Sequence, residues 1–500
     1  MGIKSKLIMP VAKWTANHIS KWSARAVKDQ DKIMMMLVAK AKNTKFGRDH
    51  GFADIKSYED YKRQVPIRDY EGLRPYVDQV VEGKSDILWP GKPKYFAKTS
   101  GTTSGVKYIP LTADSMPNHM NSAKSAMLNY IAESKDASIF DGKMIFLSGS
   151  PELSENSGIN TGRLSGIVNH EIPSWLKANQ LPSYNTNCIE EWEEKLDKIV
   201  DETLQNDLRL ISGIPPWVQM YYERLLQRTG KSSIKEIFPN YNLFMYGGVN
   251  FEPYRAQLES LIGGRIPSVE LYPASEGFIA YQINQNERGL LLNTKSGIFF
   301  EFIPVDDVHK ENPTRLKLDQ VELEKDYALI INNNAGLWGY SIGDSVRFVS
   351  LDPYKLVVSG RIKHYISAFG EHVISKEVEE AILTVANREN ISIVEFTVAP
   401  QVNPVDGGAP YHEWFVEFAE APKDMTAFSV SVDLEMVKQN IYYEDLIKGN
   451  ILQALKINKM KPDAFRSYMK DQGKLGGQNK VPRLSNDRNI ADQLSKYIDE

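Results

Sequence analysis

The chain has 500 residues, and its 60 Lys and Arg residues against 64 Asp and Glu residues give a formal net charge of −4. This length exceeds what one hydrophobic core usually serves, so we expect one large domain and one smaller domain. The near balance of charge disfavours a nucleic-acid-binding protein and a membrane-surface protein. The single cysteine, Cys188, excludes an intrachain disulfide framework and a multi-cysteine metal site.

The first 22 residues carry lysines at positions 4, 6, 13 and 21, which interrupt every apolar run. We therefore expect no secretory signal peptide and a cytoplasmic location. Lys6 stands where the N-myristoylation pattern requires Ser or Thr. No apolar stretch approaches the roughly 18 residues of a membrane span, so no membrane partner is expected.

The first predicted element is a helix over residues 14–42, where apolar residues recur at spacings of three, four or seven. Residues 46–88 are broken by Pro66 and Pro75, and we interpret them as short polar segments on a solvated surface. A second helix is predicted over residues 114–133, with Asp114 at its cap position and Pro117 in its first turn.

Between these regions, residues 98–107 combine two glycines and five hydroxyl side chains with a lysine at each end. Glycines bring backbone N–H groups close to an oxyanion, hydroxyls add donors, and lysine supplies a counter-charge. The pattern differs from the common phosphate loop, because Val106-Lys107 follows Gly105 and the next residues indicate a strand. We interpret the segment as a phosphate-binding loop in a hairpin-like setting, with a flexible surface turn as the alternative.

Short apolar strands alternate with helices in the middle of the chain. Strands are predicted at residues 144–147, 208–211, 242–246 and 268–272, and helices at 189–203, at 252–261 and in a segment ending near Arg228. This alternation predicts an α/β sheet with both faces covered, in which ligands bind at the carboxyl ends of strands. Residues 148–175, rich in Ser, Gly and Asn, are predicted to be a loop.

From Gly297 the pattern changes to strands without long helices, which predicts a mostly antiparallel sheet or barrel. Its strands are predicted at residues 298–304, 327–331, 338–340, 345–349 and 355–358. A candidate junction follows at residues 359–361. Beyond it a compact α+β module is predicted, with helices at 375–387 and 432–446 and strands at 391–398 and 414–418.

Three further motifs carry residues suited to nucleotide chemistry. Tyr272 and Glu276 close a predicted strand, where a ring can stack on a purine and a carboxylate can hold magnesium. Asp344 follows a glycine and can accept hydrogen bonds from a ribose diol. Arg361 follows another glycine and leads to a Gly-Glu segment before a helix. Taken singly, each motif also fits an ordinary turn or strand end.

In this order, the loop and the three motifs resemble the adenylate-forming superfamily, which includes acyl-CoA synthetases, luciferase and peptide-synthetase adenylation domains. More narrowly, five segments resemble the acyl-acid amido synthetase family typified by the plant auxin-responsive Gretchen Hagen proteins. The segments are residues 99–105 (Thr-Ser-Gly-Thr-Thr-Ser-Gly), 107–110 (Lys-Tyr-Ile-Pro), 274–277 (Ala-Ser-Glu-Gly), 336–340 (Gly-Leu-Trp-Gly-Tyr) before Gly343-Asp344, and 478–483 (Gln-Asn-Lys-Val-Pro-Arg).

The resemblance implies the α/β adenylate-forming enzyme fold. A large domain over residues 1–360, with α/β sheets and a small β-barrel-like part, would hold the ATP and acyl-acid site. A small mobile α+β domain over residues 361–500 would carry Lys480. The implied reaction joins ATP and a small carboxylic acid into an acyl-adenylate with release of pyrophosphate. An amine, usually that of an amino acid, then takes the acyl group to form an amide, and ATP and Mg²⁺ are the implied cofactors.

The same resemblance implies roles for single residues. Lys480 and Glu276 are the implied catalytic residues: Lys480 would neutralise the α-phosphate and the acyl oxygen, and Glu276 would bind magnesium. The superfamily usually has an acidic pair after Gly-Arg-x, and this chain has Lys363-His364 there, which leaves the hinge residue open. The implied nucleotide-binding residues are Ser100, Gly101, Thr102, Thr103, Ser104, Gly105, Lys107, Gly248, Tyr272, Ala274, Ser275, Asp344 and Arg361.

The acyl-acid pocket is predicted from position along the chain. Trp217 and Tyr221 would line it, together with Leu147 and the loop through Arg163 and His170. An apolar pocket with one cation suits an aromatic or aliphatic acid. The alternative is that Trp217 and Tyr221 belong to the helix core, since they stand four residues apart.

Two other functions stay open at this point. An acyl-CoA synthetase shares the first half-reaction and forms a thioester, and the basic run of Lys456, Lys459, Lys461 and Arg466 would suit coenzyme phosphates. The same run also fits a solvated basic face. The second alternative is a non-catalytic nucleotide-binding or scaffold protein that keeps the fold. Neither the acid, the amine nor the oligomeric state follows from the sequence.

Overall fold

The computed structural model divides the chain into two compact units. The first comprises Met1–Val249 and Glu259–Val358, and the second comprises Asn250–Leu258 and Ser359–Glu500. The predicted domains, residues 1–360 and 361–500 with their separate tasks, stay a prediction beside this division. The structure describes residues 3–100, 106–172, 177–189, 191–248, 251–308, 310–362, 365–366, 373–402, 404, 408–448, 452–475, 480–485 and 487–499.

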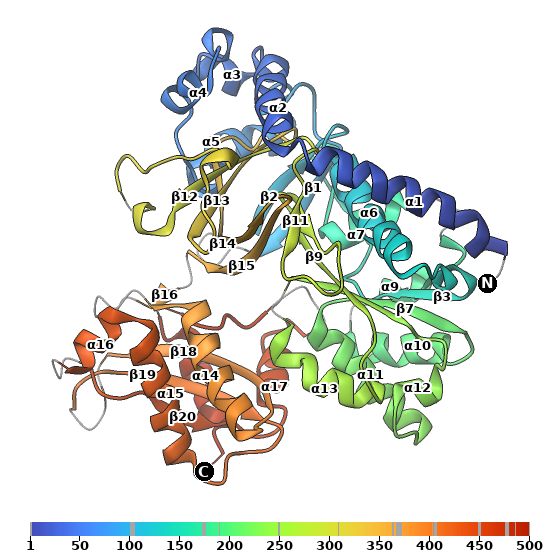
Figure 1. Ribbon diagram of the computed structural model, residues 1–500, viewed down its shortest axis with the longest axis vertical. Helices are drawn as coiled ribbons and strands as arrows, with labels where there is room; N and C mark the ends of the chain where they lie inside the picture. The colour runs from blue at the N-terminus through green and yellow to red at the C-terminus, as the bar shows by residue number, and fades with distance from the viewer. Residues whose placement is uncertain are drawn as a thin grey trace. The chain divides into compact units, whose positions relative to one another are not determined.

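The first unit is built around one eleven-stranded sheet (Figure 1). Its strand order is β12-β13-β14-β15-β11-β10-β9-β8-β7-β3-β6. Strands β6, β3, β7, β8 and β9 are parallel, and strands β9, β10, β11 and β15 pair antiparallel, as do β12, β13 and β14. The strands are β3 (Lys143–Phe146), β6 (Gln180–Leu181), β7 (Leu208–Ser212), β8 (Leu243–Gly247), β9 (Ser268–Ala274), β10 (Gly277–Tyr281), β11 (Leu290–Leu292), β12 (Ile298–Pro304), β13 (Asp326–Asn333), β14 (Tyr340–Leu351) and β15 (Tyr354–Arg361).

This sheet confirms the predicted α/β class and the change of pattern near Gly297. The four predicted strands of the α/β region correspond to β3, β7, β8 and β9. The strands predicted after Gly297 are antiparallel, as expected, and they extend the parallel strands into one continuous sheet instead of forming a separate barrel. Two strands are predicted at residues 338–340 and 345–349, and the structure has the single strand β14, which contains the second range in full and only Tyr340 of the first.

A second sheet of the first unit has the order β2-β1-β5-β4. Its strands are β1 (Tyr95–Ser100), β2 (Val106–Leu111), β4 (Ser154–Asn156) and β5 (Ile159–Gly162). The loop predicted over residues 148–175 is therefore wrong in part. Ser157 and Gly158 both have positive φ, which is the two-residue turn that joins antiparallel strands, and β5 then pairs with β1.

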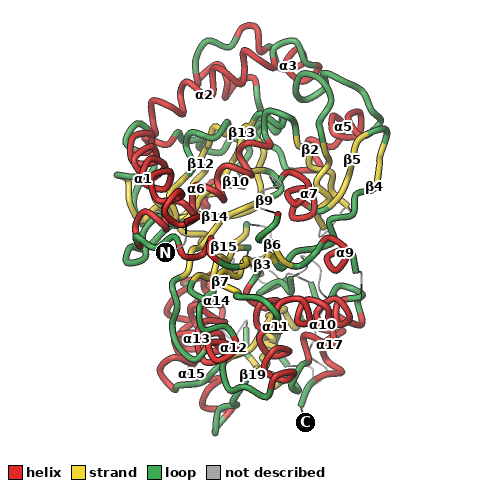
Figure 2. Tube along the Cα trace, turned by 90° about the vertical axis from the view of Figure 1, so that its right-hand side faces the viewer, coloured by secondary structure: helices red, strands yellow, loops and turns green. Residues whose placement is uncertain are grey.

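Helices cover these sheets, and none of those described combines the length and apolar character that a bilayer crossing requires. Helix α1 packs along α6, and α6 packs on β9 and β10 (Figures 1 and 2). The α-helices are α1 (Ile3–Ser23), α2 (Ala26–Ala41), α3 (Lys45–Asp49), α4 (Tyr58–Gln64), α5 (Tyr70–Val81), α6 (Met116–Ser134), α7 (Leu164–Glu171), α9 (Tyr184–Asn187), α10 (Trp192–Thr203), α11 (Pro215–Thr229), α12 (Ile234–Ile237) and α13 (Glu252–Ile262). Short 3-10 helices are η1 (Phe52–Asp54), η2 (Ser138–Asp141), η3 (Val305–Asp307) and η4 (Leu318–Gln320).

The interpretation of residues 46–88 as short surface segments is wrong. They contain α4 and α5, and α5 continues through Pro75. Ser57 and Asp69 accept hydrogen bonds from the first-turn N–H groups of these helices, which offsets their short length. Their apolar residues, including the fully buried Tyr61 and Leu73, join the core cluster that also contains residues of β12 to β14.

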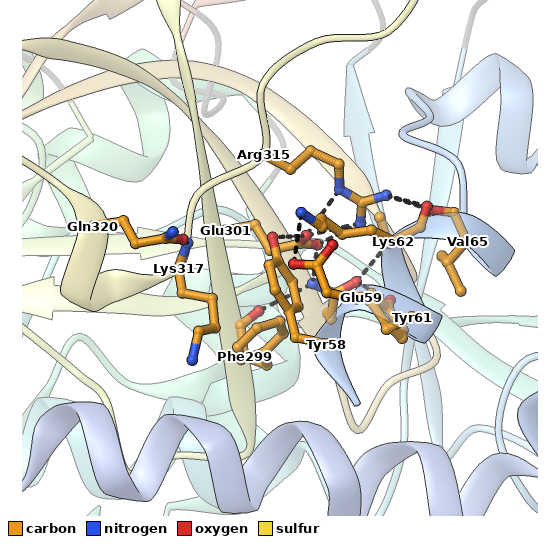
Figure 3. Close-up of polar contacts among 12 residues, drawn as sticks. Tyr58, Glu59, Tyr61, Lys62, Val65, Phe299, Glu301, Arg315, Lys317 and Gln320 are labelled. Atoms are coloured by element: carbon orange, nitrogen blue, oxygen red, sulfur yellow. Dashed lines mark hydrogen bonds and ion pairs between the residues drawn. The ribbon is translucent and has the colours of Figure 1, made fainter. Parts of the chain in front are cut away.

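A buried polar network joins α4 to the central sheet (Figure 3). Glu301 on β12 is fully buried and forms an ion pair with Arg315 at 2.8 Å. The Glu301 carboxylate also accepts hydrogen bonds from the Tyr58 hydroxyl at 2.8 Å and from the Asn332 amide at 2.9 Å. Arg315 in turn donates to the Glu301 carboxylate through Nε and Nη2. This pair of buried charges is therefore compensated within the protein.

The same network reaches the start of β14. Asn332 accepts hydrogen bonds from the Tyr61 hydroxyl at 2.5 Å and from the Gly339 N–H at 2.6 Å. Gly339 has φ near 55°, and a Cβ there would meet the Pro66 carbonyl oxygen at 2.5 Å, so only glycine fits this approach. Because Gly339 precedes Tyr340, the network positions the strand that carries Asp344.

The second unit contains a three-stranded sheet of order β18-β19-β20. Trp414 and Val416 face a cluster with α14 and α15, and Phe415 between them faces α17 and α18, as strand alternation requires. The predicted helix over 432–446 is two helices, separated at Asn440. The elements are β16 (Tyr365–Ile366), β17 (Val373–Ile374), α14 (Ser375–Glu389), β18 (Ile393–Gln401), β19 (Tyr411–Phe418), α15 (Met425–Gln439), α16 (Ile441–Lys448), β20 (Lys456–Lys459), α17 (Ala464–Asp471), α18 (Asn489–Leu494) and the 3-10 helix η5 (Ser495–Tyr497).

Candidate active site

The parallel strands β3, β7, β8 and β9 end at one edge of the central sheet. Their register pairs Phe146 with Ser212, Ser212 with Met245, and Gly247 with Leu271. Ligands of α/β sheets bind at such an edge, since loops and not strands follow it. The segments that leave this edge are residues 147–149, 213–214, 248 and 275–276.

The predicted phosphate-binding loop connects β1 and β2. These strands pair antiparallel, with Ser100 opposite Val106, so the hairpin-like setting is confirmed. The side chain of Ser100 and all of Gly101, Thr102, Thr103, Ser104 and Gly105 lie outside the described residues, and their role stays a prediction.

Lys107, the last residue of that predicted loop, lies on β2. Its ammonium group is 5.6 Å from the centroid of the Tyr70 ring. The Tyr70 hydroxyl accepts a hydrogen bond from the Tyr108 N–H at 2.9 Å, which holds α5 against β2. One face of the hairpin is thereby fixed by a helix that the sequence did not predict.

Tyr272 and Asp344, which two separate motifs singled out, are in direct contact. The Tyr272 hydroxyl on β9 donates to Asp344 Oδ2 on β14 at 2.5 Å, and both residues are buried. A buried carboxylate is stabilised by such a donor, so the two side chains orient each other. The predicted adenine-flanking and ribose-binding residues therefore belong to one cluster.

Glu276 lies in the turn between β9 and β10. Ala274 pairs with Gly277, so Ser275 and Glu276 form the tip of a hairpin and are half-buried. The Asn333 amide donates to the Glu276 carbonyl at 2.7 Å, which fixes the turn from β13.

The Glu276 carboxylate faces Tyr340. The Tyr340 hydroxyl donates to Glu276 Oε1 at 3.5 Å. Burial, with the charge of Glu276 as the next cause, raises the pKa of the Tyr340 phenol well above its ordinary value. Tyr340 consequently remains a neutral donor beside the carboxylate throughout the physiological range. Gly248, at the neighbouring strand end, is exposed and has φ near 82°.

Two predicted residues belong to the second unit. Lys480 is exposed and precedes the segment in which Leu484 pairs with Val398. Arg361 is the last residue of β15, and its side chain lies outside the described residues, as do Lys363 and His364. The roles of Lys480 and Arg361 stay predictions.

Trp217 and Tyr221, predicted for the acyl pocket, are both buried on α11. The Trp217 ring lies 5.3 Å from that of Trp192 on α10. The Tyr221 hydroxyl donates to Thr203 at 2.8 Å, and its ring is fully buried. These contacts favour helix core for Tyr221 and leave the pocket assignment a prediction.

The sequence analysis did not predict a buried lysine that lies near the same strand edge. Lys195 on α10 is only 3% exposed, and its Nζ donates to the Ser148 carbonyl at 3.1 Å and to the Asn187 carbonyl at 2.7 Å. Ser148 follows β3, the strand next to β7. The available signal was a lysine on an apolar helix face, between Trp192 and Leu196.

The sequence matches profiles of three domains that belong to one family. The GH3 family N-terminal domain matches residues 15–186 and 159–267, the GH3 family central domain matches 291–361, and the GH3 family C-terminal domain matches 376–489. Together the matched ranges include most of the chain.

Curated relatives have similar length. The jasmonoyl–L-amino acid synthetase JAR6 of Nicotiana attenuata is 21% identical over 542 aligned positions, which cover 93% of this chain and 92% of the relative. The indole-3-acetic acid-amido synthetase GH3.3 of Arabidopsis thaliana is 20% identical, with 94% of this chain and 91% of the relative covered.

Solved structures share the fold. The AtGH3.15 acyl acid amido synthetase in complex with 2,4-DB superposes with a TM-score of 0.82 at 15% identity, covering 98% of this chain and 96% of the other. A 2-hydroxyisobutyryl-CoA ligase in the postadenylation state has a TM-score of 0.55 at 10% identity, covering 96% and 91%. The predicted adenylate-forming fold is therefore confirmed.

Proposed function

The chain belongs to the GH3 family, and on that premise we propose that it is an ATP-dependent acyl-acid amido synthetase. The enzyme activates a small carboxylic acid as an acyl-adenylate, releases pyrophosphate, and transfers the acyl group to the amine of an amino acid with release of AMP. The observation that carries this proposal is the match of all three family domains in order. Of the two curated relatives described above, one is named a jasmonoyl–L-amino acid synthetase and the other an indole-3-acetic acid-amido synthetase.

The geometry of the first unit supports the nucleotide half of the reaction. Tyr272 borders the adenine, with Gly248, Ala274 and Ser275 as neighbouring backbone at the strand ends. Asp344, oriented by the Tyr272 hydroxyl at 2.5 Å, accepts hydrogen bonds from the ribose. The loop between β1 and β2 donates to the departing phosphates.

A magnesium ion fits this site as a partner of ATP and not as a resident metal. In the described part of the chain, no group of three His, Cys, Asp or Glu side chains is placed to hold a metal ion. Mg²⁺ is commonly bound by one or two carboxylates together with substrate phosphates and water, so Glu276 alone suffices on the protein side. When bound, the ion stabilises charge on the phosphates during displacement.

Lys480 and Arg361 complete the proposed machinery. Lys480 neutralises the α-phosphate and the acyl oxygen, and Arg361 binds the ribose. We place the reaction in the cytoplasm, a reducing compartment that the single, unpaired Cys188 suits. Trp217 and Tyr221 line or support the acyl pocket.

Acid-dependent ATP–pyrophosphate exchange across a library of carboxylic acids tests the proposal. At least one acid supports exchange, and Glu276→Ala and Lys480→Ala each lower its kcat about 100-fold or more, as loss of transition-state charge stabilisation requires. Lys423→Ala, which removes another exposed lysine of the second unit, leaves the rate unchanged. Absence of exchange with every acid, or full activity of both site variants, contradicts an enzymatic role.

Product mass separates the amide from a coenzyme A thioester. The basic run proposed for coenzyme phosphates is engaged within the second unit: Lys459 pairs with Asp499 at 2.6 Å, and the Lys456 ammonium lies 4.1 Å from the Tyr411 ring centroid. These contacts favour a structural role for the run. With ATP and an accepted acid, we expect acyl-amino acids as products and no acyl-CoA.

A further inference from the structure

Two cations converge on the segment that leaves strand β3. Lys195 reaches this segment through its hydrogen bond to the Ser148 carbonyl. Arg163, which follows β5, lies over the next residue: a Cβ built on Gly149 would meet Arg163 Cδ at 2.9 Å and Nη1 at 3.5 Å. A side chain at position 149 would therefore displace Arg163 from its present position. Both cations belong to the first unit.

Neither cation forms an ion pair with a residue in the described part of the chain. Lys195 donates to two backbone carbonyls and forms no ion pair, and the Arg163 guanidinium has no hydrogen bond or ion pair with any residue that the structure describes. Burial lowers the pKa of Arg163. Burial likewise lowers the pKa of Lys195 to about 8, with the Cys188 thiol opposing this shift and the charge of Arg163 adding to it.

A hydrogen-bond donor lies beside the two cations. Ser165 Oγ is 3.7 Å from the same point above Gly149, and it is a buried atom without a hydrogen-bond partner. Two uncompensated cations and an unused hydroxyl are the groups that bind a carboxylate. Lys195 is buried and Arg163 is half-buried. Charges withdrawn from water without a counter-charge cost stability, so the retention of two cations at one point indicates an anionic ligand.

The position of the cluster identifies which carboxylate binds. Strand β3 is separated from β9 by β7 and β8, so the cluster lies about 14 Å across the sheet from the Glu276 turn, at a strand spacing of roughly 4.8 Å. In an amino acid the α-carboxylate carbon is only about 2.5 Å from the nitrogen that must attack the acyl carbon. A cluster this far from the nucleotide therefore suits the far end of the acid.

We propose that Arg163 and Lys195, with Ser165, bind a second carboxylate, or an equivalent anionic group, at the far end of the acyl substrate. The inference rests on the proposed function, because it assigns the substrate class of the same site. The enzyme prefers dicarboxylic acids, or acids with a distal sulfonate or phosphate, over monocarboxylic acids of equal length.

The test compares straight-chain dicarboxylic acids with monocarboxylic acids of the same chain length in ATP–pyrophosphate exchange. Arg163→Met raises the KM of the diacid about 10- to 100-fold, the loss expected for a charge-assisted hydrogen bond, and leaves the monoacid KM within about twofold. The kcat changes little, since the far group is bound equally in the ground and transition states. Arg163→Lys recovers part of the diacid preference.

Arg224→Met is the matched control. Arg224 lies on α11, is partly exposed and, unlike Arg163, already has a carboxylate partner, Asp197 at 3.1 Å. Arg224→Met should change neither the diacid KM nor the monoacid KM. If Arg163→Met leaves the diacid KM unchanged, or raises both KM values equally, the proposal is overturned. A rise confined to the KM of the amino acid in the transfer reaction also overturns it, because the cations then bind the acceptor.

The only cysteine gives a second readout that needs no catalysis. Cys188 is half-buried and follows Asn187, whose carbonyl accepts from Lys195. A diacid, added without ATP, slows maleimide labelling of Cys188 in the wild type and not in Arg163→Met. If no acid supports exchange, the proposed function fails while this protection still supports the anion site. The anion site is contradicted if no diacid slows the labelling and if the diacid KM is the same for the wild type and Arg163→Met.

Discussion

The Glu301–Arg315 pair and the Arg163–Lys195 pair both belong to the first unit, and they differ in what surrounds the charge. Glu301 is fully buried, and its carboxylate accepts hydrogen bonds from Arg315 and Tyr58 (Figure 3). It also accepts one from the Asn332 amide. Lys195 is almost as deeply buried, yet it lies within the electrostatic influence of another cation, Arg163, which helps to lower its pKa. The first pair finds all its partners within the fold, and the second pair has no counter-charge among the residues that the structure describes.

The difference separates structural from recognition roles. A buried ion pair with all its hydrogen bonds made holds elements together, here α4, β12 and β13. Removing one partner leaves the other charge buried without compensation. Arg163 and Lys195, which have no carboxylate partner among the described residues, gain no stability from ionic attraction until an anion binds. Substitutions in the two regions should therefore affect different measurements.

Arg315→Met should give the largest effect on stability. It leaves the Glu301 carboxylate buried without a counter-charge and withdraws the donor from the Val65 carbonyl. We expect a loss of about 3–5 kcal/mol in the free energy of unfolding, measured by urea denaturation of the intact chain.

A surface arginine of the neighbouring helix provides the control for that loss. Arg63 pairs with Asp60 on α4, and its side chain is 74% exposed. Exposed pairs contribute about 0–1 kcal/mol, so Arg63→Met should cost little. Equal losses from Arg315→Met and Arg63→Met would contradict a structural role for the buried network.

Lys195→Met should have an intermediate effect. The methionine keeps the aliphatic packing on the face of α10, while the carbonyls of Ser148 and Asn187 lose their donor. Unsatisfied buried acceptors cost about 1–3 kcal/mol, partly offset here because a buried cation is removed. The same urea titration measures it, and a loss as large as that of Arg315→Met would assign Lys195 a purely structural role.

The pH dependence distinguishes the two regions further. The pKa of Lys195 is lowered to about 8 in the folded protein, below about 10.4 when unfolded. Between these values the unfolded chain binds more protons, so the stability of the wild type relative to Lys195→Met rises as pH increases from about 8 to 10. Arg163 and Cys188 are the charged or titratable groups that act on Lys195 from neighbouring segments. Diacid affinity should fall over the same range, since a neutral amine attracts no carboxylate. A flat difference between the two proteins from pH 7 to 10 would contradict this.

Much of the fold could be predicted because its signal is local. Alternation of apolar strands and helices identified β3, β7, β8 and β9, and the change at Gly297 marked the antiparallel strands. Helices α4 and α5 were missed because Pro66 and Pro75 outweighed a periodicity that tertiary packing supports. The β4–β5 hairpin was not predicted, because Ser157 and Gly158 are residue types that occur in long loops as well as in tight hairpin turns.

The site could be predicted only in part, since its contacts join distant residues. Tyr272 and Asp344 were singled out by type and order, yet their hydrogen bond crosses 72 positions and follows from the order of the sheet. Lys195 was missed because a lysine among charged neighbours resembles a surface residue. Two features distinguish Lys195 from the surrounding lysines: its face of α10 is buried, and Arg163 lies beside the segment that follows β3.

Arg163→Met should give the smallest effect on stability, so comparing it with Arg315→Met tests most directly whether the two arginines have different roles. The two substitutions are chemically identical, and they remove a guanidinium with a complete set of protein partners in one case and with none among the described residues in the other. We expect Arg163→Met to change the free energy of unfolding by no more than about 0.5 kcal/mol, because no protein acceptor is left unsatisfied. Adding a saturating dicarboxylic acid should then stabilise the wild type in thermal unfolding and leave Arg163→Met unshifted, since only a ligand that binds the folded state raises its stability. A large loss of stability without ligand would mean that Arg163, like Arg315, serves the fold.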